Sequence, residues 1–541
     1  MAADTVKESL AKTIQLADKV AKTAAEAKSF RQQCSELKYK AQQLARLLRQ
    51  AARASNDLYD SPTRRITDRT KQVLQKALHL ALKCRANSFI KRVLFTVIPN
   101  AAFRKTSSLL ENSIGDVSWL LRVSSRDGGY LGLPPIAANE PILYLVWEQI
   151  AILSAARSSE DPSCAAESLA SLARDSVLYC KIIIDEGAVR PLLKLAKKRN
   201  CEGQETAVRA IGHLGRDPES VERIVNAGVC KGFAKILKEN FRTNVQAAVA
   251  WAISELAANH PNCQNHFAQT NVVHMLANFL SHETEESMKA MAARAIWKLA
   301  KGNSSICRSI TESRGLSSLA ALLGRGPHEV RFNSAMAVME ITAVAKQNPD
   351  FRRAAFKPSS PAAKAVLDQL LGIIENGGES ELALLLPSIK AIGNLARTFR
   401  STETRIIEPL VRLLGGREAD EVSREAVVAL TKFACTGNYL HRNHCNTIIE
   451  VGGIKHLIQL VYFGEQAVRV SALVLLCYIS THRPESEALG KEEVLVVLEW
   501  ASKTPHLVWD PLVEALLPEA KGRLELYQFR GSIQRVHELI Q

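Results

Sequence analysis

The sequence predicts an all-α protein, with an N-terminal helical bundle followed by a right-handed α-solenoid built from repeats. Two observations predict this fold class. Apolar residues recur at helical spacing through most of the 541-residue chain. A short apolar helical segment also returns at intervals of about 40 to 50 residues, which is typical of stacked helical repeats.

The recurring segment is clearest as AAVAWAISELA over residues 247–257. Weaker copies are AVRAIGHLGR (207–216), AARAIWKLAKG (292–302), SAMAVMEITAV (334–344), SIKAIGNLAR (388–397) and AVVALTKFAC (426–435). This spacing lies within or near the range of HEAT and armadillo arrays, in which one unit cannot bury its apolar face without its neighbours.

Residues 1–124 show helical periodicity without the repeat, and they predict a basic amphipathic bundle. Four apolar stripes at steps of three and four carry this prediction; they run through Val6–Ala21, Phe30–Leu48, Val73–Ala81 and Leu110–Leu121. Interfacial helices lying on a membrane are the alternative. The bundle carries about 23 Lys and Arg against 10 Asp and Glu, so most of the net charge of +15 is concentrated here.

Basic pairs on the bundle mark candidate contacts with an anionic surface. They are Arg64, Arg65, Lys91, Arg92, Arg104 and Lys105. A solvated face, an anionic membrane and an acidic protein partner all remain open. Nucleic acid is not expected, because few aromatic residues accompany these cations.

The remaining boundaries follow from turn signals. Residues 125–141, rich in Gly and Pro, predict a linker, and residues 142–541 the solenoid, with about seven to eight units from Cys164 and a terminal helical cap over 508–541. Glycines such as Gly187, Gly228 and Gly315 predict sharp turns between helices. Residues 348–363 predict a basic, proline-containing loop.

No catalytic residue, metal site or cofactor is expected, and neither is a small-molecule substrate. Phosphate-binding and nucleophile motifs are absent from the sequence. His441, His444 and Cys445 have metal-like spacing but lack a fourth ligand, so we interpret them as a loop between helices. The eleven cysteines are scattered singly, so no disulfide framework is expected. No run of apolar residues is long enough to span a bilayer, and the N-terminus does not resemble a signal peptide.

The repeat resembles the armadillo family, because AAVAWAISELAAN matches the third helix of an armadillo unit. In importin-alpha-like receptors this helix carries a Trp and, four residues later, an Asn, which together hold basic peptides. Here only Trp251 and Asn394 match, which disfavours a nuclear-transport receptor. The third-helix positions predict a partner-binding groove lined by Arg209, His213, Trp251, Glu255, Arg294, Lys298, Lys390, Asn394 and Lys432.

A resemblance to the plant armadillo-repeat-only family covers nearly the whole chain. It rests on LARLLRQAARASNDLYDSPTRRI (44–66), GLPPIAANEPILYLVWEQIAIL (132–153), IIIDEGAVRPLLKLAK (182–197) and LVEALLPEAKGRLELYQ (512–528). This resemblance implies a non-enzymatic scaffold of polarised tip growth, linked to regulators of Rho-type small GTPases. It also implies location in the cytoplasm and at the plasma membrane, with the nucleus left open. A peripheral membrane adaptor acting through the bundle is the alternative function.

Overall fold

The structure is a computed structural model, and all of its regular secondary structure is helical in the residues that it describes. These are 2–54, 60–85, 100–124, 134–137, 140–154, 161–198, 203–239, 242–258, 260–281, 284–376, 381–399, 404–415 and 420–540. The all-α prediction is thereby confirmed. The chain forms two compact units, residues 1–256 and 257–541, and each is described by itself.

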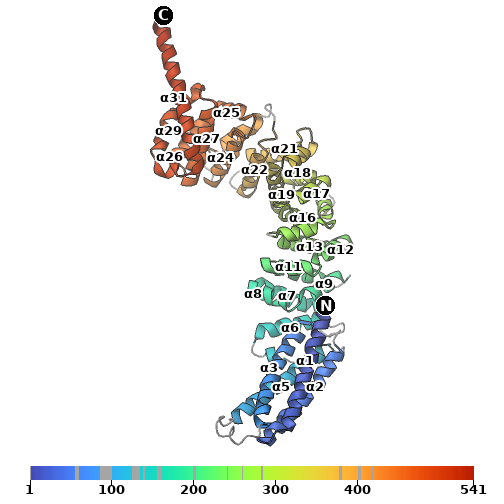
Figure 1. Ribbon diagram of the computed structural model, residues 1–541. Coiled ribbons are helices and arrows are strands. Elements are labelled where there is room, and N and C mark those ends of the chain that lie inside the picture. The colour runs from blue at the N-terminus through green and yellow to red at the C-terminus, as the bar shows by residue number, and fades with distance from the viewer. Residues whose placement is uncertain are drawn as a thin grey trace. The chain divides into compact units, whose positions relative to one another are not determined.

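Four long helices at the start of the first unit form the predicted bundle. They are α1 (Ala2–Ala25), α2 (Arg31–Arg53), α3 (Asp60–Arg85) and α5 (Asn100–Ser124), and they lie side by side in Figure 1. Each contributes a buried leucine to one core: Leu10, Leu44, Leu74 and Leu110. The apolar stripes of the sequence therefore face one another, as a bundle requires.

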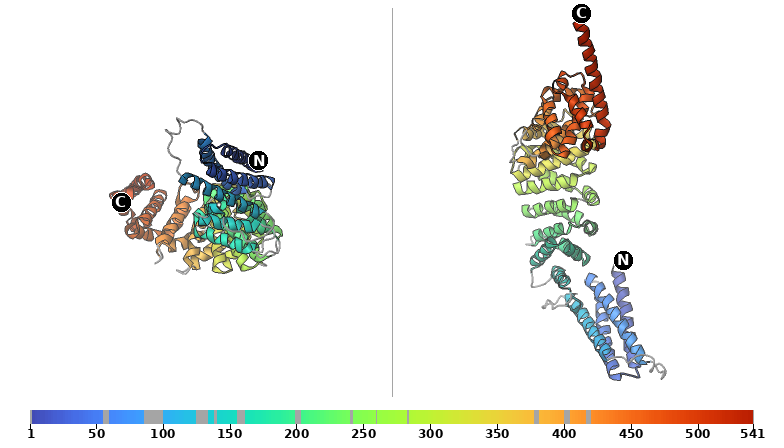
Figure 2. Two further views of the ribbon diagram at one scale, coloured as in Figure 1. Left: turned by 90° about the horizontal axis from the view of Figure 1, so that it is seen from below. Right: turned by 90° about the vertical axis from the view of Figure 1, so that its left-hand side faces the viewer.

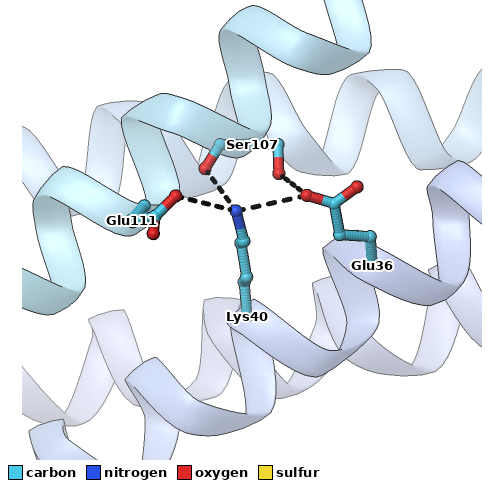
Figure 3. A network of polar contacts seen from close by, with 4 residues as sticks. All are labelled: Glu36, Lys40, Ser107 and Glu111. Carbon is cyan, nitrogen blue, oxygen red and sulfur yellow. Dashed lines mark hydrogen bonds and ion pairs between the residues drawn. The ribbon is translucent and has the colours of Figure 1, made fainter.

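A polar network joins α2 to α5 at the edge of this core (Figure 3). The Lys40 Nζ atom lies 3.1 Å from Glu111 Oε2 and 3.2 Å from Glu36 Oε1, and it donates to the Ser107 carbonyl at 3.4 Å. The Ser107 hydroxyl donates to Glu36. Burial opposes the ammonium charge, but Glu111 and Glu36 together raise the Lys40 pKa above its ordinary value. The charge of Lys40 thus fixes two helices of the bundle to each other.

The bundle shares its core with the helix that follows it. After the short turn η1 (Pro135–Ala137) comes α6 (Pro141–Ser154), whose Trp147 is fully buried and stacks on Trp119 of α5 at 5.7 Å between ring centroids. Ile136 of η1 is also buried, and its backbone N–H donates to Asp116 Oδ1 at 2.7 Å. The described part of the predicted linker is therefore packed against the bundle.

A buried carboxylate, Glu186, ties this junction to the first repeat. It caps α8 (Val177–Asp185) and accepts a hydrogen bond of 2.7 Å from Trp147 Nε1. The Arg65 guanidinium of α3 approaches the other Glu186 oxygen at 3.0 Å and Glu140 at 3.4 Å. Because a buried carboxylate needs both charge and hydrogen-bond partners, this arrangement couples the bundle to the repeats within the first unit.

The rest of the first unit consists of three-helix repeats, each with two shorter helices and a third helix. The helices are α7 (Pro162–Asp175), α8, α9 (Val189–Lys197), α10 (Gln204–Leu214), α11 (Pro218–Asn226), α12 (Val229–Glu239) and α13 (Thr243–Ala257). Gly187 and Gly228 have φ of 85° and 86° between the first and second helices of their repeats. These positive angles confirm the predicted glycine turns, because side chains with a Cβ rarely adopt them.

The second unit continues the same pattern. Its helices are α14 (Pro261–Ala268), α15 (Val272–Asn278), α16 (Glu286–Ala300), α17 (Ser304–Glu312), α18 (Gly315–Gly324), α19 (His328–Gln347), α20 (Pro349–Ala355), α21 (Pro361–Asn376), α22 (Leu382–Asn394), η3 (Thr404–Ile406), α23 (Ile407–Arg412), α24 (Asp420–Ala434), α25 (His441–Glu450), α26 (Gly453–Phe463), α27 (Gln466–His482), α28 (Glu487–Lys491), α29 (Val494–Ser502), α30 (Pro505–Val508) and α31 (Pro511–Ile540).

Successive third helices in this unit pack on one another. Helix α16 contacts α19, α19 contacts α22, α22 contacts α24, α24 contacts α27, and α27 contacts α31. Figure 2 shows these helices as layers, with α31 extending past the last of them. Equivalent positions of neighbouring third helices are consequently brought close together in space.

Two expectations about loops were wrong. Residues 349–355 form α20 instead of a loop, because Asn348 caps its N-terminus by accepting from Phe351 N and Pro349 occupies the first turn, where no N–H is needed. His441, His444 and Cys445 lie in α25. The glycine turn predicted at Gly315 is present before α18: Arg314 takes the positive φ of 58°, and Gly315 is needed because a Cβ would approach the Ile310 carbonyl.

Candidate partner-binding site

The nine predicted groove residues all lie on third helices. Arg209 and His213 belong to α10, Trp251 and Glu255 to α13, Arg294 and Lys298 to α16, Lys390 and Asn394 to α22, and Lys432 to α24. Arg209 is exposed, and the other eight are half-buried. Partial exposure leaves part of each side chain open to a partner while the rest packs against the repeat.

In the first unit, three of the four predicted residues come together around one indole ring. Trp251 packs over Gly212, where a Cβ atom would lie 2.5 Å from the ring. His213 meets the ring edge-on at 4.8 Å between centroids, and Arg209 Cζ lies 5.9 Å from its centroid. Trp251 therefore packs against the neighbouring repeat with part of its ring and leaves the rest exposed to solvent.

The histidine beside this indole is not a cation at neutral pH. Burial lowers the pKa of His213 to about 4, and the cations Arg216, Arg174 and Arg209 act in the same direction. Its Nδ1 atom has no hydrogen-bond partner among the described residues. His213 therefore contributes shape to the surface and no charge.

A second group of residues gathers on α22 and α24 in the second unit. Lys432 Nζ donates to Asn394 Oδ1 at 3.0 Å, and Asn394 Nδ2 donates to Thr342 Oγ1 of α19 at 3.4 Å. Lys390 Nζ lies 3.8 Å from Glu425 Oε1. The amide of Asn394 is thus already engaged on both sides, unlike an asparagine held open for a peptide backbone.

Helix α16 presents a further mixed surface with an indole that the sequence analysis missed. Lys298 Nζ lies 3.5 Å from the centroid of the Trp297 ring, and Trp297 meets Phe332 of α19 edge-on at 6.0 Å. Burial raises the pKa of Glu340 on α19, although Lys301, Trp297 and Lys298 all oppose the rise. The contact of Lys298 with an aromatic face is a cation–π interaction.

Lys346 and Glu425 also act on Lys432 of the candidate site, and the sequence did not predict either residue there. The predicted groove residues occupy two positions four residues apart on a third helix, and neither Lys346 nor Glu425 stands at such a position. Residues seven apart share one helix face, so Glu425, seven residues before Lys432, could have been predicted from the sequence. No comparable rule selects Lys346.

Among the predicted anionic-surface residues, Arg64, Arg65, Arg104 and Lys105 are exposed, while Lys91 and Arg92 lie outside the described residues. Arg65 is held in its ion pairs with Glu186 and Glu140. Arg104 and Lys105 form no ion pair with any described residue. The charge of Arg65 is therefore partly neutralised by the carboxylates at the junction between the bundle and the first repeat.

Two further properties concern the described residues alone. No three His, Cys, Asp or Glu side chains in that part of the chain gather as a metal site. His444 instead packs against Phe433 at 5.1 Å, and Cys445 is buried. None of the described helices combines the length and apolarity needed to cross a bilayer.

Comparisons with known proteins agree with this arrangement. A domain of unknown function, DUF7792, matches residues 7–125, and the Armadillo/beta-catenin-like repeat matches residues 179–216. No curated protein gives a significant sequence match.

Solved structures resemble the chain in fold. The crystal structure of an engineered protein is 22% identical with a TM-score of 0.51, covering 70% of this chain and 99% of its own. Computationally designed armadillo repeat proteins for modular peptide recognition give 21% identity and a TM-score of 0.40, over 47% and 99%. A designed armadillo repeat protein in complex with peptide (KR)4 gives 19% and 0.39, over 45% and 99%.

The chain therefore contains an armadillo-type repeat, and the predicted fold class, a helical N-terminal region with an armadillo-repeat solenoid, is confirmed.

Proposed function

We propose that this protein is a non-enzymatic scaffold that binds segments of partner proteins along its third helices. One observation carries the proposal: equivalent positions of successive third helices present half-buried aromatic, amide and charged side chains. Such side chains, partly fixed by packing and partly open, are typical anchors of protein–protein contacts. Repeat arrays commonly use their extended surface in this way.

The charges on these helices favour an acidic partner segment. Arg209, Arg294, Lys298, Lys390 and Lys432 outnumber Glu255 among the predicted groove residues. Cations at these positions repel a basic peptide and attract an acidic one. A nuclear-transport receptor for basic peptides is correspondingly disfavoured.

The finer role follows from the resemblance to the plant armadillo-repeat-only family. We propose that the partners include regulators of Rho-type small GTPases, and that the scaffold acts in polarised cell growth in the cytoplasm and at the plasma membrane. Affinity purification of the protein with its partners would identify these partners. The same experiment, carried out with variants of the groove residues, tests whether the groove binds them.

Replacing Trp251 by Ala together with Arg294 by Glu is expected to lower partner recovery at least tenfold in affinity purification from growing plant cells. The change removes one aromatic anchor and reverses one charge on the third helices. The matched control replaces Trp509 by Ala and Arg308 by Glu, both of which are exposed and lie off the third helices. Equal recovery by both double variants, with circular dichroism unchanged, would refute the groove.

A second candidate function, membrane association through the bundle, is favoured by an imbalance of ion pairs. Five described carboxylates of the bundle, Glu8, Asp18, Glu26, Glu36 and Glu111, are paired with four cations, whereas exposed Asp68 forms no ion pair with a described residue. Many exposed cations remain beyond these pairs, Arg104 and Lys105 among them. Each Lys or Arg near an anionic leaflet contributes about 1 kcal/mol of attraction.

The full chain is expected to sediment with anionic vesicles and not with neutral ones, and to be released by salt. Replacing Arg64, Arg104 and Lys105 by Glu should weaken this binding at least tenfold. The matched control makes the same charge change at exposed Arg308, Lys357 and Lys364 of the second unit. An equal loss in the control would show a general effect of net charge and exclude a membrane site on the bundle.

A further inference from the structure

Three lysines from three successive third helices of the second unit lie at, or within one helical turn of, the hydrogen bonds that Asn394 makes to Lys432 and Thr342. They are Lys346 of α19, Lys390 of α22 and Lys432 of α24. Lys346 is exposed, while Lys390 and Lys432 are half-buried, so the cluster reaches solvent.

The carboxylate paired with Lys390 of this cluster is shared with another cation. Glu425 Oε1 lies 3.8 Å from Lys390 Nζ and also 3.2 Å from the Arg424 guanidinium. Lys432 Nζ is bonded to the neutral amide of Asn394 at 3.0 Å. Lys346 forms no ion pair with any described residue. The cations of the cluster are therefore incompletely neutralised.

The electrostatic state of Lys432 reflects this shortage of negative charge. Burial, together with Lys346 and Lys390, lowers the Lys432 pKa to about 8, and Glu425 opposes this shift without compensating for it. An ammonium has three N–H donors, of which Asn394 takes one, so two remain for a ligand. A negatively charged ligand would satisfy these donors and relieve the repulsion among the lysines.

We propose that Lys346, Lys390 and Lys432 form a binding site for the carboxylate of an Asp or Glu side chain in a partner segment. This inference rests on the proposed scaffold function and specifies where the partner is recognised. Charge complementarity selects the ligand, since the site combines several cations with a single shared carboxylate. A carboxylate also matches the donors chemically, because its two oxygens accept bonds from more than one ammonium.

The proposal is tested with the full chain and a fluorescent twelve-residue peptide of Glu and Gly, followed by fluorescence anisotropy. Replacing Lys390 and Lys432 by Met keeps the apolar stems and removes the charges. We expect the dissociation constant to rise at least tenfold in this variant. The control variant, with Lys357 and Lys364 replaced by Met, should stay within twofold, because these exposed lysines lie off the third helices.

Wild-type binding should weaken from about pH 7 to about pH 9, because Lys432 loses its proton as the pH passes its pKa of about 8. The groups that influence this titration are Lys346 and Lys390, which lower the pKa, and Glu425, which raises it. The Lys390/Lys432 variant should lose most of this dependence.

Three results would overturn the proposal: absent binding of the Glu peptide, equal affinities for the two double variants, or equally tight binding of a Lys and Gly peptide. Tenfold preference for a peptide with phosphoserine in place of Glu would overturn the choice of a carboxylate. If partner recovery from cells still depends on Trp251 and Arg294 while the lysine variants bind normally, the scaffold function stands and this site is refuted.

Discussion

Replacing Trp147 by alanine is expected to lower the free energy of unfolding of the first unit by about 3–5 kcal/mol. The Trp147 side chain is fully buried, stacks on Trp119 and donates to Glu186. Its removal leaves a cavity between the bundle and α6 and deprives a buried carboxylate of a hydrogen bond. Urea denaturation followed by circular dichroism measures the loss, and hydrogen exchange of peptides from α5 and α6 locates it.

Two other tryptophan variants separate the contributions to this effect. Replacing Trp147 by Phe keeps most of the ring but removes the N–H donor, so we expect a smaller loss of about 1–3 kcal/mol. Replacing Trp509 by Ala, where 79% of the side chain is exposed, should change stability by less than about 0.5 kcal/mol. If the Trp147 and Trp509 alanine variants were equally stable, the shared core would be excluded.

The same junction bears on how the first unit folds. Arg65 of α3 and Trp147 of α6 both contact Glu186 at the end of α8. The bundle core also includes Leu143 and Trp147 from outside residues 1–124. A fragment limited to those 124 residues would expose part of this core, so bundle functions are better tested in the full chain.

Helix positions were largely predictable from the sequence, and their caps were less so. The apolar stripes gave α1, α2, α3 and α5, because each buries one face against the others. Helix α20 was not predicted, because Asn348 and Pro349 together are typical of a loop. In the structure they begin the helix, and Phe351 in its first turn is buried. Pro is common both in loops and in the first turn of helices, so its presence alone does not decide.

Contacts between distant positions were beyond sequence reasoning. The repeat period predicted that Asn394 and Lys432 occupy equivalent places, and the structure shows them bonded. It did not predict that Arg65, selected as a surface cation, pairs with Glu186 in the first repeat. That pairing depends on how the bundle packs on α6 and α8, for which the periodicity of either segment contains no information.

Acidification is expected to destabilise the second unit through His482. Burial, together with the neighbouring His441, Arg523 and Arg442, lowers the His482 pKa to about 4, and Glu519 opposes this shift. His441 lies 4.2 Å away between ring centroids, and His482 Nε2 has no partner among the described residues. The unfolded chain, with an ordinary histidine pKa of about 6.5, therefore binds a proton before the folded chain does.

The sign and the pH range follow from these two values. Above about pH 6.5 both states are neutral at His482 and no penalty exists; between about pH 6.5 and 4 the free energy of unfolding falls, by at most about 3 kcal/mol from this residue. His213 acts in the same direction in the first unit. Carboxylates also titrate in this range, so the measured quantity must be the difference between a variant and the wild type.

Replacing His482 by Gln removes the titrating group, and its stability relative to wild type should rise as the pH falls from 7 to about 4.5. Urea denaturation at several pH values measures this difference. The control replaces exposed His266 of α14 by Gln and should follow the wild-type profile. If the His482 variant lost stability in parallel with wild type, the folded protein would have to accept a proton at His482 without cost. The repulsion of a protonated His482 by Arg442 of α25 and Arg523 of α31 would then have to be screened by solvent. Such screening does not fit a His482 side chain that is only 8% exposed.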